Sequence, residues 1–455
     1  MYDILIIGAG PGGYVAAIKA AQLGAKVAII EKENVGGVCL NHGCIPTKTY
    51  LKSAKTYKEV LNSQEFGINV SGETTFDWQK ILKRKNDIVK QLTNGVSFLL
   101  KKNKIDVFNG FADVLSSSKV KVNDQILETK KLVLATGASP IILDVKGAED
   151  ALKNNTLVTY RELLNITEIP KNLVIIGGGV VGVEFATIFN TFGSKVTIIE
   201  KEDSILSNMD LDIKTSYTKR LKTDQIDIIT QATITKMTAN SITYVKEGNE
   251  TTIDSDLILM AAGTKSNLQG LEKLELKLDR SNVVTNEYLE TNIPNVYAIG
   301  DLNGKYKLAH VAMHEGIIAV GHALGIDIPK MQYDKIPACI YGAPEIATIG
   351  LTEKQAKEKG LDYKVAKVPL AAVGKAMVDG QKEGFVKMIV GKKYLDVLGV
   401  HIYAYNATEL ISNISITMEL EGTAHEIAHA IFPHPTLSEL TMETALAAID
   451  KAIHI

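Results

Sequence analysis

Two cysteines lie close together near the start of the chain, within the segment 36–48. Cys39 and Cys44 are five positions apart, and the 455-residue chain has only one further cysteine, Cys339. We expect a helix to begin around Cys39 to Cys44, and a helix N-terminus lowers a thiol pKa, which favours thiolate exchange. A purely structural disulfide that closes so short a loop would stabilise the folded state by only about 2 kcal/mol. The pair is therefore predicted to be a redox-active disulfide.

A zinc site is the alternative interpretation of this pair. The spacing lies at the margin of the C-x₂₋₄-C pattern, and no second Cys/His pair is nearby. His42, between the cysteines, is interpreted as a bystander, and Cys339 as a small buried hydrophobic residue. Three cysteines in so long a chain do not form a secreted disulfide framework, which favours a reducing, cytoplasmic compartment. We predict no metal.

Two glycine-rich turns follow strand patterns and open helical patterns, one near the start of the chain and one far downstream. They contain Gly8, Gly10 and Gly13, and then Gly177, Gly179 and Gly182. A G-x-G-x-x-G match alone often marks an ordinary turn. In a strand-turn-helix unit, however, it lets the backbone approach a pyrophosphate at a helix N-terminus. The sequence thus predicts two nucleotide sites.

Each of these units ends in a glutamate at the end of its second strand pattern. Glu31 and Glu200 stand where a carboxylate binds a ribose 2′-hydroxyl. The alternative is that either glutamate is a solvent-exposed residue at the end of a strand, with no binding role. An acid at this position repels a 2′-phosphate, and no arginine lies between residues 195 and 219. We therefore expect the second site to take NAD rather than NADP.

A dithiol does not pass a hydride to nicotinamide directly, whereas a flavin accepts a thiolate adduct and returns a hydride. Two nucleotide sites and a cysteine pair therefore predict FAD, NAD and a disulfide in series. The exchange step also needs a base. Among nine histidines, His434 is flanked by Pro433 and Pro435 and is followed by Glu439 at a predicted helix start. The residues leave open whether His434 is that base or a structural histidine in a turn; His454 is interpreted as an ordinary terminal residue.

The element pattern predicts an α/β protein with two Rossmann-like domains, each with a β insertion, and a C-terminal α+β domain. A long amphipathic helix is expected over 76–104, short antiparallel strands over 118–134, and a helix over 308–324. The expected regions are an FAD-binding domain (1–145), an NAD-binding domain (146–269), a central segment completing the FAD domain (270–333) and a C-terminal interface domain (334–455).

Charge and hydropathy exclude several functions. With 50 Lys+Arg against 52 Asp+Glu, the net charge of −2 offers no basic surface for nucleic acid or acidic membranes. The most apolar long stretch, 173–193, contains Glu184 and five glycines, which favours a buried strand-turn-helix over a membrane span. No targeting segment is visible at the start of the sequence.

Together these residues resemble the flavin disulfide reductases along the whole chain. The resemblance is carried by GGVCLNHGCIPTK (36–48), IIGGGVVGVEFA (175–186), YAIGD (297–301), LAHVAMHEG (308–316), APEIATIGLTE (343–353) and HPTLSE (434–439). One departure is Gly263-Thr264-Lys265, where the family usually has Gly-Arg, and it puts a contact in the NAD domain in doubt.

The resemblance implies two sets of cofactor contacts. The FAD set is Gly8, Gly10, Gly13, Glu31, Lys48, Thr136, Gly137, Asp301 and Ala309, with Asp301 on the ribityl chain and Lys48 near the flavin. The NAD set is Gly177, Gly179, Gly182, Glu184, Glu200 and Gly263, and Glu184 is also expected to pair with Lys48.

The resemblance also implies an activity. Cys39 would exchange with the substrate disulfide, Cys44 would be the charge-transfer thiolate, and His434 with Glu439 would act as base across a homodimer interface. The expected reaction oxidises protein-bound dihydrolipoamide and reduces NAD⁺. The expected partner is a lipoyl-bearing acyltransferase of a 2-oxoacid dehydrogenase complex or the lipoyl protein of glycine cleavage. The alternatives are a flavin-dependent reductase of another disulfide or quinone, and a flavoprotein that serves only for docking.

Overall fold

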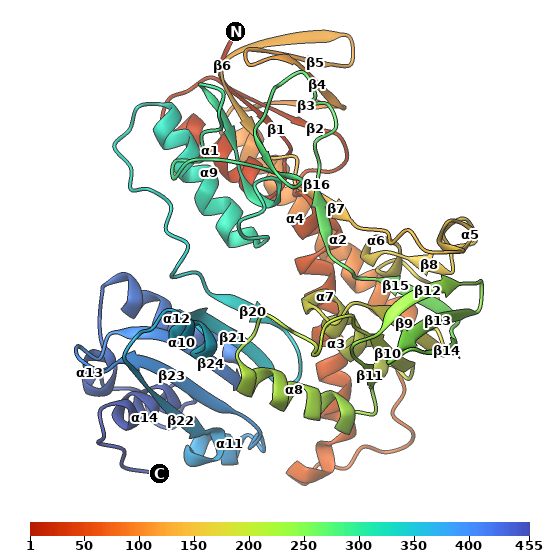
Figure 1. Ribbon diagram of the computed structural model, residues 1–455, viewed down its shortest axis with the longest axis vertical. Helices are drawn as coiled ribbons and strands as arrows, with labels where there is room; N and C mark the ends of the chain where they lie inside the picture. The colour runs from red at the N-terminus through yellow and green to blue at the C-terminus, as the bar shows by residue number, and fades with distance from the viewer.

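The computed structural model describes residues 1–455, which form two sheets with parallel centres and an antiparallel C-terminal domain (Figure 1). The first sheet runs β3-β2-β1-β6-β19 in its parallel part, and β4 and β5 extend β6 as an antiparallel ribbon. Its strands are β1 (Tyr2–Ile7), β2 (Val27–Glu31), β3 (Asp106–Asn109), β4 (Ala112–Ser116), β5 (Lys119–Val122), β6 (Gln125–Leu134) and β19 (Val296–Ala298). The central strands are continuous apolar runs because both faces of a parallel sheet are covered.

The second sheet repeats this arrangement in the order β11-β10-β9-β15-β8. Its strands are β8 (Leu157–Val158), β9 (Asn172–Ile176), β10 (Lys195–Ile199), β11 (Asp227–Ile229) and β15 (Leu257–Met260). The inserted antiparallel meander consists of β12 (Thr233–Met237), β13 (Ser241–Lys246) and β14 (Asn249–Asp254). In both sheets the strand before the glycine-rich turn is central, so each turn opens at the carboxyl edge, where dinucleotides bind. The predicted fold class is confirmed.

Short strands and helices complete the two nucleotide-type regions. The two-stranded pairs are β7 (Ala138–Pro140) with β16 (Thr264–Ser266), and β17 (Leu278–Asp279) with β18 (Asn282–Val283). The helices are α1 (Pro11–Gln22), α2 (Gly37–His42), α3 (Cys44–Leu61), η1 (Ser63–Phe66), α4 (Trp78–Lys102), α5 (Ala148–Lys153), α6 (Tyr160–Leu163), α7 (Val180–Thr191), α8 (Leu211–Thr223), η2 (Gly300–Leu302) and α9 (Ala309–Ala323). None of the helices in the chain has the length and hydropathy needed to cross a membrane.

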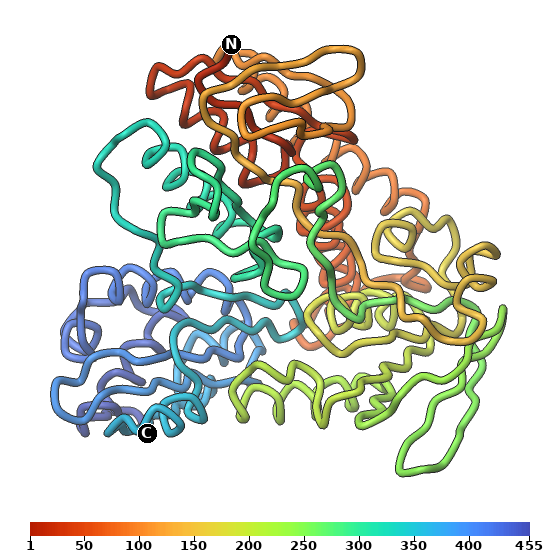
Figure 2. The backbone as a smooth tube through the Cα atoms, turned by 45° about the horizontal axis from the view of Figure 1, so that its top comes forward, coloured from red at the N-terminus to blue at the C-terminus, as the bar shows by residue number.

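Helix α9 returns the chain to the first sheet, beside α1, after the second sheet is complete (Figures 1 and 2). The two helices touch through glycines: a Cβ on Gly12 would lie 2.9 Å from the Ala312 carbonyl oxygen, and one on Gly316 would lie 2.7 Å from the Gly12 carbonyl oxygen. This close approach places the start of α9 next to the first glycine-rich turn.

The C-terminal domain is a five-stranded antiparallel sheet in the order β20-β21-β24-β23-β22. Its elements are β20 (Ala338–Ile340), β21 (Glu345–Gly350), α10 (Glu353–Glu358), β22 (Tyr363–Pro369), η3 (Leu370–Ala372), α11 (Gly374–Val378), β23 (Phe385–Gly391), β24 (Val397–Ala404), α12 (Ala407–Glu419), α13 (Ala424–His429) and α14 (Glu439–Ala448). Its core joins the sheet to α12, α13 and α14, and includes Val386, Ile402, Ile414 and Leu440.

A buried lysine joins this domain to the second nucleotide-type region. Lys387 of β23 donates to Asp210 (2.9 Å) and Asp212 (2.7 Å) at the start of α8, and to Glu353 of α10 (2.6 Å). Only 2% of the Lys387 side chain and 1% of the Asp210 side chain are exposed. Removing one partner would leave a buried charge uncompensated, so this network holds the two regions together.

Lys387→Met is expected to lower the free energy of unfolding by about 3–5 kcal/mol, because Asp210 loses its buried counter-charge. Urea unfolding at fixed protein concentration measures the loss. Lys392→Met is the matched control, because the Lys392–Asp362 pair is exposed and such pairs contribute at most about 1 kcal/mol. Equal unfolding midpoints for wild type and Lys387→Met would contradict the expectation.

The pH dependence of that difference follows from the carboxyl groups. Burial opposes ionisation of Asp210 and Asp212, but hydrogen bonds from Lys387, and from Lys367 to Asp212, lower both pKa values below the usual 3.8. A lowered carboxyl pKa contributes stability that is present above the unfolded-state pKa and is lost as pH falls through the folded-state pKa. The gap between wild type and Lys387→Met should therefore be full at neutral pH and narrow on the acid side of 3.8.

Candidate active site

The cysteine pair lies at a break between two helices, not at the start of a single helix. Cys39 is inside α2, and Cys44 is the first residue of α3, as Gly43 between them has a non-helical backbone (φ −136°, ψ −113°). A Cβ on Gly43 would lie 3.0 Å from the Val38 carbonyl oxygen. A helix does begin around Cys39 to Cys44, as predicted, but there are two helices: Cys39 is the third residue of α2 and Cys44 is the first residue of α3.

The surroundings make the two thiols unequal. A hydrogen bond from Cys39 lowers the pKa of Cys44 against the opposing effect of burial, and the charge of Lys48 lowers it further. That same hydrogen bond and burial raise the pKa of Cys39. Lys48 follows Cys44 by one helical turn of α3, so its charge is on the same side of the helix. These surroundings therefore favour the thiolate on Cys44 over the thiolate on Cys39.

Lys48 is held by a carboxylate from the second nucleotide-type region. Its Nζ donates to both oxygens of Glu184, at 3.0 and 2.8 Å, and the Glu184 side chain is only 4% exposed. The backbone N–H of Tyr341 also donates to Glu184, at 3.0 Å, and Lys48 Nζ lies 4.7 Å from the centre of the Tyr341 ring. Lys48 and Glu184 thus meet as expected; the contribution of Tyr341, just after β20, has no signal in the sequence.

The first glycine-rich turn is built to admit a phosphate. Gly8 has a positive φ of 101°, and a Cβ there would lie 2.2 Å from the Ala135 carbonyl oxygen. A Cβ on Gly13 would lie 1.8 Å from the Gly8 carbonyl oxygen. At Gly10, by contrast, only the Gly37 Cα would lie within 4 Å, and this N-cap leaves the first N–H groups of α1 without a side-chain partner. The N–H groups and the open space fit the pyrophosphate of a dinucleotide.

The second glycine-rich turn has the same geometry. Gly177 has a φ of 107° and approaches the Ala261 carbonyl oxygen, and a Cβ on Gly182 would lie 2.0 Å from the Gly177 carbonyl oxygen. Nothing lies within 4 Å of a Cβ built on Gly179, which caps α7 without a side-chain bond. The two turns therefore fit two dinucleotides.

The two strand-end glutamates are held in matching ways. Glu31 accepts from the backbone N–H groups of Ala9 (2.7 Å) and Glu33 (2.8 Å). Glu200 accepts from those of Gly178 (2.6 Å) and Glu202 (2.9 Å). Each carboxylate keeps free lone pairs beside its turn, as a ribose-binding group requires.

The remaining expected FAD contacts lie around the same turn. Thr136 and Gly137 follow β6, and both are hydrogen-bonded to Asn267. Gly263, an expected NAD contact, follows β15 at the equivalent place in the second region. Ala309 is the first residue of α9. Asp301 lies in η2, and its pKa is raised by burial against the charge of Lys307.

A buried carboxylate that was not predicted from the sequence supports the turn of Asp301. Glu315 of α9 is fully buried and accepts from the Gly300 N–H (2.6 Å), the Asn303 amide (3.0 Å) and the Tyr333 hydroxyl (2.6 Å). It therefore fixes the turn that presents Asp301. The sequence did contain a signal for this role, because Glu315 is an acidic residue within a mostly apolar helix.

The His434–Glu439 pair is formed as predicted, in the C-terminal domain. His434 Nδ1 lies 2.8 Å from Glu439 Oε1, and the Thr436 N–H donates to Glu439 Oε2 at 2.8 Å. The His434 ring is 76% exposed while Glu439 is 18% exposed, so a partly buried carboxylate orients an accessible imidazole. Within one chain the pair shares no hydrogen bond with Cys39 or Cys44.

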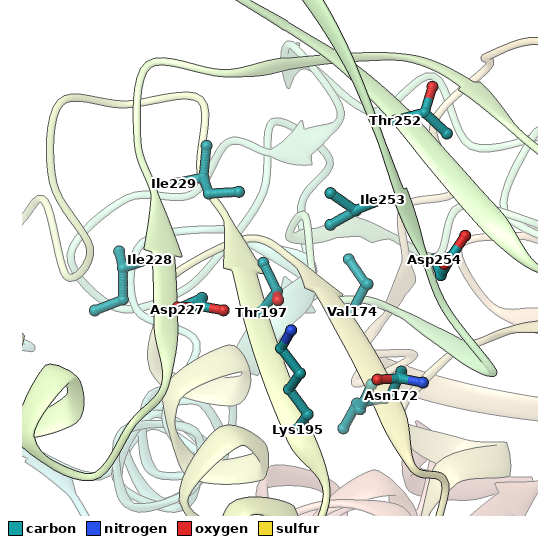
Figure 3. Close-up of a pocket in the computed structure, with 11 residues that line it drawn as sticks. Asn172, Val174, Lys195, Thr197, Asp227, Ile228, Ile229, Thr252, Ile253 and Asp254 are labelled. Atoms are coloured by element: carbon teal, nitrogen blue, oxygen red, sulfur yellow. The ribbon is translucent and has the colours of Figure 1, made fainter.

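A cavity of about 570 Å³ lies elsewhere, between β9–β11 and β14 (Figure 3). Lys195 extends into it beside Thr197, and Asp227 and Asp254 lie at its walls. It contains neither a fingerprint glycine nor a cysteine, and it is on the opposite end of β10 from Glu200. The cavity is therefore separate from the redox chemistry.

Two dinucleotide turns around a cysteine pair define an oxidoreductase that couples a nucleotide to a disulfide. The chain belongs to the pyridine nucleotide-disulphide oxidoreductase family: residues 2–316 match this family, and residues 336–445 match its dimerisation domain. The resemblance drawn from the sequence is confirmed, and the expected cofactors, FAD and NAD, are those of the family.

Named relatives agree with this assignment. A dihydrolipoyl dehydrogenase from Acholeplasma laidlawii is 59% identical over 332 residues, covering 73% of this chain and 99% of that protein. One from Bacillus subtilis (strain 168) is 40% identical over 475 residues, covering 100% and 99%. The Cu(II) complex of the HOCl-induced flavoprotein disulfide reductase RclA from Escherichia coli has a TM-score of 0.87 at 28% identity, covering 98% and 99%. LpdA from Mycobacterium tuberculosis shares the fold, with a TM-score of 0.90 at 24% identity over 98% and 99%.

Glu200→Ala is expected to raise the KM for NAD⁺ by about 10- to 100-fold, which is the effect of losing hydrogen bonds to a charged group. The variant should also show a smaller preference for NAD⁺ over NADP⁺. Steady-state kinetics with both nucleotides measures this, with FAD content as a check on the first site. Glu202→Ala is the control, because that exposed side chain follows the strand end without a place at the turn. An unchanged KM, or loss of FAD, would place Glu200 outside the NAD site.

Proposed function

We propose that this chain acts as a dihydrolipoyl dehydrogenase, oxidising protein-bound dihydrolipoamide to lipoamide with NAD⁺ as acceptor. The observation that carries the proposal is the unequal cysteine pair with Lys48 and Glu184 between two dinucleotide turns. The names of the relatives support the same substrate. The chain carries the dimerisation domain of its family, which supports a homodimer.

The cofactor contacts are proposed as the sequence implied them. The FAD-side residues are Gly8, Gly10, Gly13, Glu31, Lys48, Thr136, Gly137, Asp301 and Ala309, and the NAD-side residues are Gly177, Gly179, Gly182, Glu184, Glu200 and Gly263. Bound FAD supplies the two-electron relay between the dithiol and the nicotinamide. Lys48 of the first set and Glu184 of the second form an ion pair, which holds beside Cys44 the charge that lowers its pKa.

The thiol exchange is assigned to the chain's own residues. His434 of the partner subunit accepts a proton from a substrate thiol, and Glu439 stabilises the resulting imidazolium. The substrate thiolate attacks Cys39, the Cys39–Cys44 bond breaks, and Cys44 leaves as a thiolate stabilised by Lys48. The second substrate sulfur then displaces Cys39, and its proton goes to the departing Cys39 sulfur. This closes the substrate disulfide and leaves the two electrons on the cysteine pair, with Cys39 as a thiol, Cys44 as a thiolate and the first proton on His434.

The lipoyl group would be carried by an acyltransferase of a 2-oxoacid dehydrogenase complex or by the lipoyl protein of glycine cleavage. A cytoplasmic location fits, because a working dithiol needs reducing surroundings. RclA, a flavoprotein disulfide reductase of similar fold, makes another disulfide the competing substrate.

A panel of substrates ranked by kcat/KM tests the proposal: dihydrolipoamide, reduced glutathione and a dithiol without the lipoyl chain, each with NAD⁺, and a quinone with NADH. Dihydrolipoamide is expected to rank first by at least about 100-fold, as differential transition-state binding allows. A higher kcat/KM for one of the other compounds would contradict the proposal and identify that compound as the better substrate.

A further inference from the structure

A second carboxylate lies on α14, one helical turn after Glu439. The Glu443 side chain is only 2% exposed and makes no ion pair with a lysine or an arginine. A buried carboxylate is costly unless hydrogen bonds compensate its charge. The groups that form hydrogen bonds with the Glu443 carboxylate therefore indicate its role.

Those partners come from the segment that follows α14. After Ala448 the chain turns at Asp450, which has a φ of 60°, and comes back along the helix. The backbone N–H groups of Ile453 and His454 both donate to Glu443 Oε1 at 2.7 Å, and His454 Nδ1 lies 3.2 Å from Oε2. We name Glu443 with residues 453–454 the tail clamp.

Little apart from the carboxylate holds these tail residues. Ile453 is 70% exposed and the His454 side chain is 63% exposed, so apolar burial contributes little there. His454 is a terminal, mostly exposed residue, as the sequence indicates, but its contact with Glu443 was not predicted. The sequence around His454 does not indicate its contact with Glu443, because Glu443 lies on α14 and residues 453–454 reach it only after the chain reverses direction.

The tail clamp and the His434–Glu439 pair are electrically linked. Glu439 and Glu443 are separated by four residues and therefore lie on the same face of the helix, where like charges destabilise each other. Burial opposes ionisation of Glu439, but the bonds from His434 and the Thr436 N–H, with the charges of His434 and His454, lower its pKa. Burial likewise opposes ionisation of Glu443, and the tail N–H groups and His454 lower its pKa. The tail thus keeps both carboxylates ionised side by side.

We propose that the tail clamp positions the His434–Glu439 pair, and that Glu443 is a positioning residue for the thiol half of the reaction. The inference rests on the proposed function, in which His434 is the base. Loss of Glu443 would release residues 453–454 from α14, one turn from Glu439. Glu439 would then be held less firmly, and so would the His434 ring that it orients.

Three variants of the full-length FAD-loaded enzyme separate the possible roles. Glu443→Ala removes the acceptor, whereas Glu443→Gln keeps an oxygen for both N–H groups and an amide to face the His454 ring. Asp450→Asn is the matched control, because Asp450 makes an exposed ion pair with Lys364 beside the tail. For each variant, dihydrolipoamide:NAD⁺ turnover is compared with NADH oxidation by an artificial acceptor, which bypasses the base.

We expect Glu443→Ala to lower dihydrolipoamide turnover about 10-fold, the scale of losing a partner that orients a working group. Acceptor reduction, FAD content and dimer mass should be unchanged, and hydrogen exchange at residues 450–455 should rise. Glu443→Gln should restore most of the turnover, and Asp450→Asn should match wild type. Full activity in Glu443→Ala, or equal loss of both activities, would overturn the positioning role.

The controls distinguish this outcome from failure of the proposed function. If wild type did not oxidise dihydrolipoamide, or His434→Gln had no effect, the proposed function would fail and the clamp with it. If wild type and His434→Gln behave as proposed and Glu443→Ala is fully active, the clamp alone is wrong.

Discussion

Cys44→Ser should abolish NAD⁺-dependent oxidation of dihydrolipoamide, lowering turnover by about four orders of magnitude or more, as expected on removal of a reacting nucleophile. A serine oxygen forms no bond equivalent to the disulfide, so no electron pair is stored at the site. The hydrogen bond from Cys39 and the charge of Lys48 lower the pKa of Cys44, which favours the thiolate on this sulfur. Turnover under saturating substrate measures the loss.

The same variant should still bind FAD and reduce an artificial acceptor with NADH, because both dinucleotide turns and Lys48 are intact. Cys339→Ser is the control: this half-buried thiol in β20 has its pKa raised to about 11 by burial and by Glu345, so it is not a thiolate at neutral pH. Full turnover in Cys44→Ser would remove the cysteine pair from the mechanism, whereas loss of turnover in Cys339→Ser would show that Cys339 is also needed.

His434→Gln should lower dihydrolipoamide turnover by about 10²- to 10⁴-fold, the contribution of a positioned general base. Glutamine can still donate to Glu439 but does not accept the substrate proton. Acceptor reduction by NADH should be retained, because it does not use the thiol half of the reaction. His429→Gln, in the neighbouring helix α13, is the control; equal loss of both activities would exclude His434 as the base.

Mixed dimers test whether the base crosses the subunit interface. Combining inactive Cys44→Ser and His434→Gln chains should restore about one quarter of wild-type activity, because half of randomly paired dimers are mixed and each mixed dimer has one complete site. If each site used its own chain's histidine, no complete site would form and the mixture would stay inactive.

Features set by neighbouring residues were predictable from the sequence. The glycine-rich turns, the strand-end glutamates and the start of α14 at Glu439 each follow from spacing along one strand-turn-helix unit. The meeting of Lys48 with Glu184 was expected from family resemblance rather than from periodicity. The break at Gly43 was missed because a single glycine between two helical patterns does not show where each helix ends.

The remaining contacts depend on segments that meet only in the folded chain. Glu315 supports the Asp301 turn through Tyr333, which lies beyond the end of α9. Lys387 reaches Asp210 from a strand of another domain. Hydrophobic periodicity assigns the elements that carry these residues but contains no information on which elements touch.

Glu184 has a consequence for the order of assembly. Its carboxylate receives Lys48 from the first region and the Tyr341 N–H from the C-terminal domain, while α7 belongs to the second region. A chain in which any one of these parts has not docked has the cysteines without a correctly held lysine. The contribution of Lys48 to the lowered pKa of Cys44 is therefore in place only when all three parts have docked.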